Sequence, residues 1–341
     1  MKTHASNGLS VLKASVSRSS ILKASLARSF SRRLTTTARL FLLLLVCSVA
    51  QSAFAQQQYR TRGDFDGDTH TDFAVFRPSE GNWYIQSIWL DKVITQNWGN
   101  ADDAIAPEDY DGDAVADIAV WRESDGNWYI IPSSTGVARI VNLGLAGDIP
   151  VPSDYNGDGK AEVAIFRPSN GYWEVRDLDG ALVKNGVLIG TNGDKPVPGD
   201  YTGDGRSDFA VFRPSEGKWY VVNSATNQLT VRQWGNSDDR PVPAFYDNDQ
   251  REDFAVYRPS EGNWYILNSL TNTAEVRGWG NADDIPVPGD YDADGMSDVA
   301  VFRPSEGKWY VYLKPNNHAF SGTWGTAGDV PLPAAYLPKG D

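Results

Sequence analysis

Hydrophobic and polar positions return in the same order about every 45 residues along most of the chain. An acidic segment of nine residues, 290–298, is followed by the apolar run 299–302, by a turn that contains Pro and Gly, and by a second run that begins at Lys308. The last acid of the nine-residue segment recurs in steps of 45, 45, 46, 45 and 45 residues, at Asp72, Asp117, Glu162, Asp208, Asp253 and Asp298. A fixed period of this size indicates a repeat architecture.

Each repeat predicts four short β-strands and no helix. The apolar runs contain four to six residues, are rich in Val, Ile, Phe, Tyr and Trp, and are separated by Gly, Pro, Asn and Asp. The run after each acidic segment, such as 209–212, is continuously apolar, so both faces of that strand are expected to be buried. Six such units predict an all-β fold, a six-bladed β-propeller of four-stranded repeats. The recurrent aromatic positions are therefore assigned to the core. They are Trp83, Trp128, Trp173, Trp219, Trp264 and Trp309, with Phe76, Trp121, Phe166, Phe212, Tyr257 and Phe302.

A segment bracketed by proline, such as Pro196-Val197-Pro198, precedes the acidic segments of the later repeats but is missing from the first. A further copy of this segment stands at 330–336, after the last repeat. We therefore predict that 330–336 pairs beside the strand 73–77, so that the C-terminal strand closes the ring. An open ring would leave two sheet edges exposed.

The first 55 residues differ from the repeats and are predicted to be a signal or targeting segment. Residues 1–63 contain no Asp or Glu, and the apolar run 40–46 follows Arg39 and precedes Ala53-Phe54-Ala55. This order is typical of a secretory signal cut after Ala55, and the run is too short to span a bilayer. A transit peptide, a start codon placed too far upstream, a twin-arginine signal at Arg32-Arg33 and a lipid anchor at Cys47 remain alternatives. The propeller domain is then 56–341, and the expected location is extracellular or on the cell surface, with the periplasm as a further possibility.

The remaining domain is strongly acidic. Residues 1–55 contain eight Lys and Arg and no acid, so their removal takes the formal charge from −13 to −21. Such a surface repels nucleic acid and anionic membranes and favours cations. The only cysteine, Cys47, leaves with the signal. The domain therefore has no disulfide, and a bound metal is the obvious substitute. We expect a monomer without a membrane span.

The acidic segments have the donor pattern of a site for a hard cation. Asp recurs at positions 1, 3, 5 and 9, and Gly at position 4 or 6 permits a sharp turn with positive φ. An EF-hand needs flanking helices and Glu at position 12, where this chain has Val or Ile on a predicted strand. The alternative is an acidic turn that is merely solvated.

The pattern D-x-D-x-D-G-x-x-D, placed between two strands of a repeat with F-x-x-F and R-P-S-x-G-x-W-Y, resembles FG-GAP or VCBS-type repeats of the integrin-α-like kind found in bacterial secreted proteins. The resemblance covers about residues 59–341 and implies a propeller whose loops bind calcium. It implies these metal ligands: Asp64, Asp66, Asp68 and Asp72; Asp109, Asp111, Asp113 and Asp117; Asp154, Asn156, Asp158 and Glu162; Asp200, Asp204 and Asp208; Asp290, Asp292, Asp294 and Asp298. Thr202 breaks the pattern in the fourth loop, where weaker binding is expected. Phe245 removes the first acid of the fifth loop and makes calcium there doubtful.

Two further sets of residues recur with the repeat. Arginines follow the second strand and aspartates precede the Pro-bracketed segment, and six copies of each predict a repeated ion pair, with an anion-binding ring as the alternative. They are Arg77, Arg122, Arg167, Arg213, Arg258 and Arg303, with Asp103, Asp148, Asp194, Asp239, Asp284 and Asp329. Turn glutamates form a candidate multivalent ligand site: Glu80, Glu216, Glu261 and Glu306.

Catalytic motifs are scarce in the sequence. The chain has three histidines and no G-x-S-x-G, H-E-x-x-H or glycine-rich phosphate loop. We therefore predict a non-catalytic recognition or adhesion module for extracellular glycan or protein ligands, with calcium as its bound ion. Two alternatives remain open: a carbohydrate-active enzyme that uses a carboxylate pair, and a purely structural component of the cell envelope.

Overall fold

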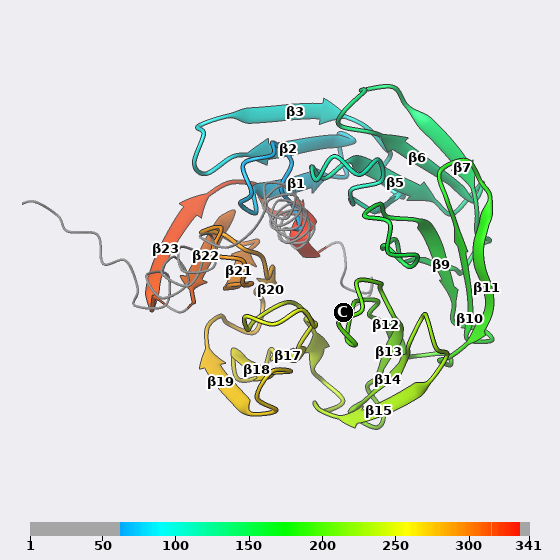
Figure 1. The fold of residues 1–341 in the computed structure, drawn as a ribbon. Coiled ribbons are helices and arrows are strands. Elements are labelled where there is room, and N and C mark those ends of the chain that lie inside the picture. The colour runs from blue at the N-terminus through cyan, green and yellow to red at the C-terminus, as the bar shows by residue number, and fades with distance from the viewer. Residues whose placement is uncertain (1–61, 315, 335–341) are drawn as a thin grey trace, which may run out of the picture. The chain divides into compact units, whose positions relative to one another are not determined.

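The computed structural model describes residues 62–314 and 316–334, which form six four-stranded antiparallel sheets arranged in a ring (Figure 1). The predicted six-bladed β-propeller is therefore confirmed. The sequence from residue 1 to 61, which includes the predicted signal, lies outside the described residues. Among the residues described, no helix is long and apolar enough to cross a membrane.

Each blade uses its strands in chain order, from the ring axis outward, and blade 1 takes its innermost strand from the C-terminal part of the chain. Blade 1 contains β24 (Val330–Pro331), β1 (Phe73–Arg77), β2 (Asn82–Gln86) and β3 (Val93–Asn97). Blade 2 contains β4 (Ala104–Ile105), β5 (Ile118–Arg122), β6 (Asn127–Ile131) and β7 (Arg139–Asn142). Blade 3 contains β8 (Ile149–Pro150), β9 (Val163–Arg167), β10 (Tyr172–Arg176) and β11 (Leu182–Leu188).

The remaining blades repeat this arrangement. Blade 4 contains β12 (Lys195–Pro196), β13 (Phe209–Arg213), β14 (Lys218–Val222) and β15 (Leu229–Gln233). Blade 5 contains β16 (Arg240–Pro241), β17 (Phe254–Arg258), β18 (Asn263–Leu267) and β19 (Ala274–Gly278). Blade 6 contains β20 (Ile285–Pro286), β21 (Val299–Arg303), β22 (Lys308–Leu313) and β23 (His318–Thr323). A short 3-10 helix, η1 (Leu332–Ala334), follows β24.

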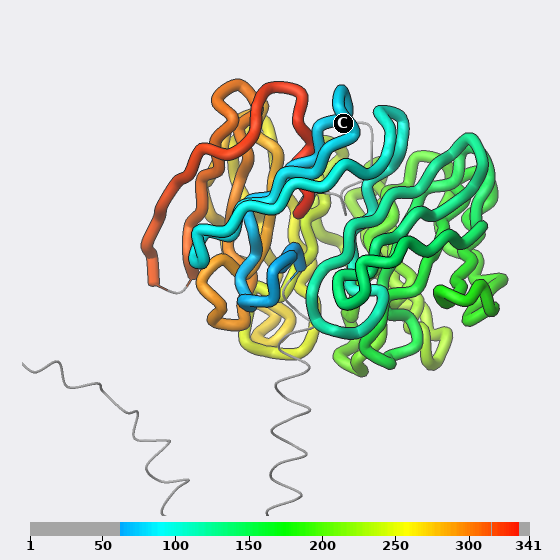
Figure 2. Tube along the Cα trace, turned by 90° about the horizontal axis from the view of Figure 1, so that it is seen from above, coloured from blue at the N-terminus to red at the C-terminus, as the bar shows by residue number. Residues whose placement is uncertain are grey.

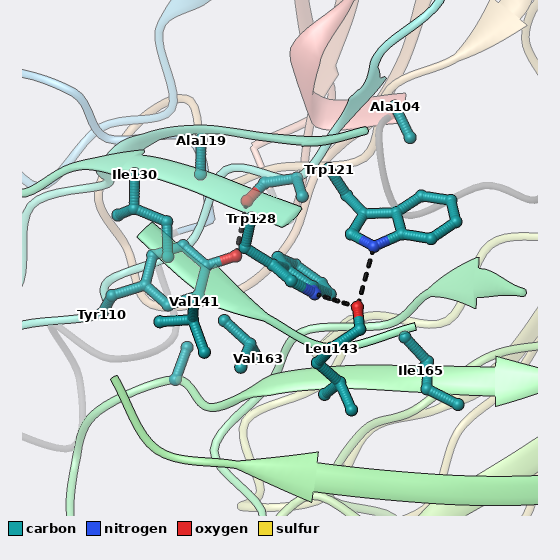
Figure 3. Close-up of a cluster of buried hydrophobic side chains, with 12 residues drawn as sticks. Ala104, Tyr110, Ala119, Trp121, Trp128, Ile130, Val141, Leu143, Val163 and Ile165 are labelled. Carbon is teal, nitrogen blue, oxygen red and sulfur yellow. Dashed lines mark hydrogen bonds between the residues drawn. The ribbon is translucent and has the colours of Figure 1, made fainter. Parts of the chain in front are cut away.

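The core lies between neighbouring blades, as the aromatic pattern predicts. The recurrent tryptophans of the third strands are fully buried, and in β1, β9, β13 and β21 the four apolar residues of the second strand are buried on both faces. Figure 3 shows one cluster, in which Trp121 and Trp128 of blade 2 pack against Val163 of blade 3. Both indole N–H groups donate to the carbonyl of Leu143, at 2.9 and 3.0 Å. The buried tryptophan N–H groups are thus satisfied, as burial of a polar group requires.

The turn between the second and third strands of each blade needs glycine. Gly81, for example, has φ +67°, and a Cβ there would lie 2.4 Å from the carbonyl oxygen of Gly99. The N–H of Trp98 in turn donates to the carbonyl of Gly81, at 2.8 Å. The close approach of these backbones explains why the turn carries glycine in all six repeats.

The ring is closed by β24, as predicted. Pro331 pairs with Val75 and Val330 with Phe76, and Leu332 is fully buried in the same blade. Figure 2 shows this red C-terminal strand beside the blue strands of blade 1. The rest of the predicted closing segment, 335–336, lies outside the described residues.

The six predicted arginine–aspartate pairs all form, each within one blade. Arg258, for example, places Nε and Nη2 at 2.7 and 3.0 Å from the two oxygens of Asp239, and its guanidinium stacks over Tyr265 at 4.3 Å. In blade 1 the pair joins the two ends of the described chain, with Arg77 at 2.7 and 2.9 Å from Asp329. Because each guanidinium is already held by a carboxylate, these arginines stabilise the blades, and the structure does not favour the alternative of an anion-binding ring.

Candidate metal centres

The six acidic segments lie at one end of the ring, between the innermost and second strands of successive blades. We name them loop 1 (64–72), loop 2 (109–117), loop 3 (154–162), loop 4 (200–208), loop 5 (245–253) and loop 6 (290–298). In each loop the acid at position 9 accepts a hydrogen bond from the N–H of position 2, as Asp72 does from Phe65 at 2.9 Å. In the five loops whose first residue is Asp, that Asp accepts backbone N–H bonds from within the turn, as Asp64 does from Gly67 and Thr69 at 2.7 and 2.8 Å. These bonds curl the loop so that its carboxylates face inward.

Carboxylate oxygens converge in loops 1, 2, 3 and 6. In each of them three side chains place one oxygen apiece within 4.8 Å of one another. The groups are Asp64, Asp66 and Asp72; Asp109, Asp111 and Asp117; Asp154, Asp158 and Glu162; and Asp290, Asp292 and Asp294. These are the four loops that have Asp at position 1 and Asp or Asn at position 3, and every member of the four groups is among the predicted ligands.

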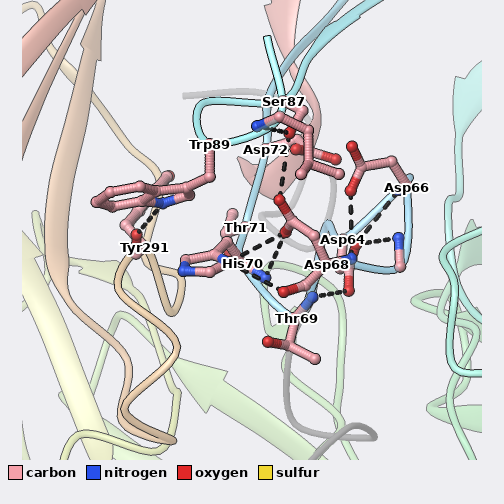
Figure 4. Close-up of polar contacts among 12 residues, drawn as sticks. Asp64, Asp66, Asp68, Thr69, His70, Thr71, Asp72, Ser87, Trp89 and Tyr291 are labelled. Atoms are coloured by element: carbon pink, nitrogen blue, oxygen red, sulfur yellow. Dashed lines mark hydrogen bonds and ion pairs between the residues drawn. The ribbon is translucent and has the colours of Figure 1, made fainter. Parts of the chain in front are cut away.

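The remaining predicted ligands of these four loops lie next to the groups and make other contacts. Asp68 accepts a hydrogen bond from the Ser87 hydroxyl at 3.2 Å, and Asp113 accepts one from Ser133 at 2.7 Å (Figure 4 shows loop 1). Asn156 donates its amide to Asp158 at 3.1 Å. Asp298 accepts backbone bonds from Tyr291 and Lys314, at 2.9 and 2.8 Å.

Loop 1 and loop 6 contain buried carboxylate oxygens that have no hydrogen-bond partner. These atoms are Oδ1 of Asp72, Oδ2 of Asp66 and Oδ1 of Asp292. Asp72 is only 1 % exposed. An orphaned buried carboxylate oxygen is costly unless a cation or a donor meets it, so these atoms fit a bound metal ion.

Burial and mutual repulsion raise the pKa values of the acids at position 9. Burial, together with the charges of Asp66, Asp64 and Asp68, raises the pKa of Asp72 to about 8. Burial likewise raises the pKa of Glu162 and Asp298 to about 8 and that of Asp117 to about 7. Without a cation these groups are therefore hard to ionise where they stand.

Loop 4 receives an amide donor from outside the loop, and loop 5 contains a guanidinium donor of its own. In loop 4 the amide of Asn223 donates to the Thr202 hydroxyl at 2.8 Å and to Asp204 at 3.0 Å, and it lies 3.4 Å from Asp208. In loop 5 the guanidinium of Arg251 lies 3.0 Å from Asp249.

In loop 4, Asp200, Asp204 and Asp208 stay predicted metal ligands, although the neutral amide of Asn223 already lies among them. Loop 5 has a positive charge of its own, which explains in physical terms why the acid missing at Phe245 can be tolerated.

A ring of backbone hydrogen bonds joins the six loops, and no sequence pattern predicts it. The N–H of position 8 in each loop donates to the carbonyl of position 1 in the loop of the preceding blade. The bonds are Ala116 to Asp64 (2.6 Å), Ala161 to Asp109 (2.7 Å), Ser207 to Asp154 (2.6 Å), Glu252 to Asp200 (2.7 Å), Ser297 to Phe245 (2.6 Å) and Thr71 to Asp290 (2.7 Å). Each candidate ligand at position 1 is therefore tied to the next blade, so a metal ion in one loop would also stiffen the junction with its neighbour.

A departure from the repeat places an exposed tryptophan beside loop 1. Trp89 is 55 % exposed, and its indole N–H donates to the carbonyl of Tyr291 in loop 6 at 3.0 Å. The ring of His70 in loop 1 lies 5.1 Å from the Trp89 ring, and His70 Nδ1 is 3.1 Å from Asp68 Oδ1 (Figure 4). The indole is thus fixed between two loops with much of its surface open to solvent.

The turn glutamates are exposed, as expected, but their carboxylates are already engaged. Glu80 accepts the Tyr84 hydroxyl at 2.6 Å, and Glu216 accepts Arg213 at 3.0 Å and Lys218 at 2.7 Å. Glu261 and Glu306 repeat the arrangement with the tyrosine four residues on. Hydrogen bonding to Tyr84 lowers the pKa of Glu80. These groups have less capacity to accept a ligand hydroxyl than their exposure suggests.

Comparison with known proteins supports the fold. No family model matches the chain, and no curated protein matches it. Among solved structures, TolB from Acinetobacter baumannii is similar with a TM-score of 0.54 and 16% identity, over 76% of this chain and 65% of that one. A lectin from Agrocybe aegerita is similar with a TM-score of 0.50 and 15% identity, over 77% and 80% of the two chains. At these identities the likeness shows the β-propeller fold alone, and the FG-GAP or VCBS type stays a prediction.

Proposed function

We propose that the protein is an exported, calcium-stabilised β-propeller that recognises glycans without turning them over. The observation that carries recognition is the fixed and exposed indole of Trp89. Tryptophan offers a large apolar face at low cost in conformational entropy, and this ring is already oriented by Tyr291 and His70. The apolar face of a sugar ring matches such a surface, and the neighbouring acids of loop 1 supply acceptors for its hydroxyls.

Calcium is the ion that the donor set favours. The groups are built from carboxylate oxygens alone, on loops that curl through short backbone bonds, and hard oxygen ligands in a flexible loop suit Ca²⁺ better than Mg²⁺. Bound calcium would supply positive charge to oxygens that have no other partner. Extracellular calcium modules bind with dissociation constants of about 10⁻⁴ to 10⁻³ M. At ten times that constant one site contributes about 1.4 kcal/mol to stability.

The scaffold is compatible with glycan recognition. The Agrocybe aegerita lectin, which recognises non-reducing terminal N-acetylglucosamine, has a similar fold. That likeness shows only that a propeller can present a glycan site, and Trp89 is the feature of this chain that supports one.

The test is a glycan array probed with the parent protein, Trp89→Ala, Trp89→Phe and Leu229→Ala. Leu229 is 57 % exposed on the outer strand of blade 4 and serves as a control for loss of exposed apolar surface. Trp89→Ala is expected to weaken binding at least tenfold, which corresponds to about 1.4 kcal/mol. Trp89→Phe should retain most of the binding because an aromatic face remains, and Leu229→Ala should not change it. Equal binding by the parent and Trp89→Ala would refute this site, and hydrolysis of an arrayed glycan by the parent would refute the non-catalytic proposal.

A further inference from the structure

The axis of the propeller contains a cavity of about 520 Å³ whose walls are largely apolar. The innermost strands and the proline-rich segments after them line it, with Val151, Val197 and Val242 on three successive blades. Arg62 lies in the lining, and its Nη2 is 2.7 Å from Glu252 Oε1. A cavity of this volume is large enough for a drug-sized molecule.

One position in the repeat departs from this apolar lining on two neighbouring blades. The first residue of the innermost strand is apolar in blades 1, 2, 3 and 6 but basic in blades 4 and 5. The six residues are Val330, Ala104, Ile149, Lys195, Arg240 and Ile285. Arg240 lines the cavity. Two adjacent basic side chains at the axis of so acidic a protein are not needed by the blade, because the other four blades do without them.

Arg240 has no carboxylate partner among the described residues. Its Nη1 donates to the carbonyl of Asp284 at 3.1 Å. The carboxylates of Asp239 and Asp284 are each held by two hydrogen bonds from another arginine, Arg258 and Arg303. The positive charge of Arg240 therefore stays uncompensated by these neighbours. Burial and the charge of Arg240 lower the pKa of Lys195, which places the two basic groups near each other.

The acids in the cavity lining belong to blades 2 and 3 or to the connection before blade 2. Asp148 pairs with Arg167 at 2.7 Å, and Glu123 accepts the N–H of Gly147 at 2.7 Å. Asp102 is exposed. Blade 2 stands three places from blade 5 in a ring of six, so Glu123 and Arg240 lie on opposite sides of the axis, and Asp148 of blade 3 is two places from Arg240 and already paired.

We propose that the axial cavity binds a small organic anion, with its carboxylate or sulfonate group at Arg240 and its apolar body along the proline and valine walls. A charged group in a largely apolar cavity attracts a counter-ion more strongly than the same group in water, because the surroundings screen it less. The apolar body adds affinity in proportion to the surface it buries. This site is separate from the glycan site at Trp89.

The test is a fluorescence titration of the purified protein with the anionic dye 8-anilinonaphthalene-1-sulfonate, beside the uncharged N-phenyl-1-naphthylamine. The variant is Arg240→Ile, which takes the residue found at the equivalent position of blade 6. The matched control is Arg232→Ile on the exposed outer strand of blade 4, which removes the same charge away from the axis. Arg240→Gln provides a second variant that also removes the charge, so the outcome does not depend on the folding of a single substitution.

We expect one molecule of the anionic dye per chain, at least tenfold weaker binding by Arg240→Ile and Arg240→Gln, and unchanged binding by Arg232→Ile. Decanoate should displace the dye, whereas 1-decanol should do so poorly. The uncharged dye should bind the parent and Arg240→Ile alike. Anionic-dye binding by both axial variants within twofold of the parent, or equal loss in Arg232→Ile, would overturn the proposal.

Discussion

The ring closure can be tested with two substitutions that remove the same contact from two different blades. Asp329→Asn breaks the pair with Arg77, which joins residues 252 positions apart, and Asp239→Asn breaks the pair with Arg258, which joins residues 19 apart. The contacts are otherwise alike, because both aspartate side chains are 1 % exposed and each accepts two hydrogen bonds of 2.7 to 3.0 Å from its arginine and one from a backbone N–H. Only the covalent path between the partners differs.

The expected cost is similar for the two substitutions. Hydrogen bonds to charged groups contribute about 1.5 to 3 kcal/mol, and the arginines are about a fifth exposed, so we expect about 2 kcal/mol for each variant. For a domain of this size that loss lowers the Tm by about 4 °C. Differential scanning calorimetry should therefore give nearly equal shifts.

Local opening should differ between them. In blade 5 the strand β16 is covalently connected to β17 through loop 5, whereas in blade 1 β24 meets β1 only through non-covalent contacts. Once the contact between β24 and β1 opens, the longer covalent path between them makes its re-formation less favourable by about 2 kcal/mol of closure entropy than in blade 5. Hydrogen exchange in β1 should therefore accelerate about 30-fold in Asp329→Asn, while β17 in Asp239→Asn should change much less. Equal acceleration in the two blades would refute the idea that β24 is the weak point of the ring.

Two further predictions concern the loops. In the presence of a chelator, the Tm should fall as the pH rises from 5.5 to 8. The raised pKa values of Asp72, Glu162 and Asp298 mean that the folded chain holds protons in this range which the unfolded chain has already released near pH 4. Thermal melts at several pH values check this prediction. Calcium requires the ionised carboxylates, so its stabilising effect should be larger at pH 8 than at pH 5.5, and a chelated protein with no pH dependence in this range would contradict the assignment. In loop 5, Phe245→Asp combined with Arg251→Ser restores an acid at position 1 and removes the internal cation, so equilibrium dialysis should detect one more bound calcium ion than in the parent. An unchanged count would show that Arg251 is not what keeps calcium out of loop 5.

The sequence predicted the parts of the molecule that repeat. The 45-residue period determines the number of blades, and continuous apolar runs identify the strands that are buried on both faces. The extra Pro-bracketed segment identified the closing strand because the first repeat lacks this segment and a further copy follows the last repeat. The arginine and aspartate sets could be matched because each occurs six times at a constant separation of 19 residues, apart from the pair that closes the ring.

Contacts that the repeat pattern does not mark could not be predicted. Asn223 reaches loop 4 from 15 to 21 residues further along the chain, and no periodicity marks its role. From the sequence Glu80 is expected to be a free surface carboxylate, but the hydroxyl of the tyrosine four residues further on donates a hydrogen bond to it. In the sequence, Trp89 and Arg240 are recognisable only as departures from the repeat. The surroundings of Trp89 come from a neighbouring blade and those of Arg240 from the axial cavity, and both require the closed ring.

The most direct test of the calcium assignment is a count of bound calcium ions by equilibrium dialysis at millimolar free calcium, for the parent and for Asp72→Asn. The four groups of converging carboxylates predict four ions per chain at this concentration, with further weak binding by loop 4 only as calcium is raised. Asp72→Asn removes an oxygen charge from loop 1 alone, so three ions should remain. A parent that binds no calcium, or an Asp72→Asn variant that binds as much as the parent, would contradict the assignment of these loops as metal centres.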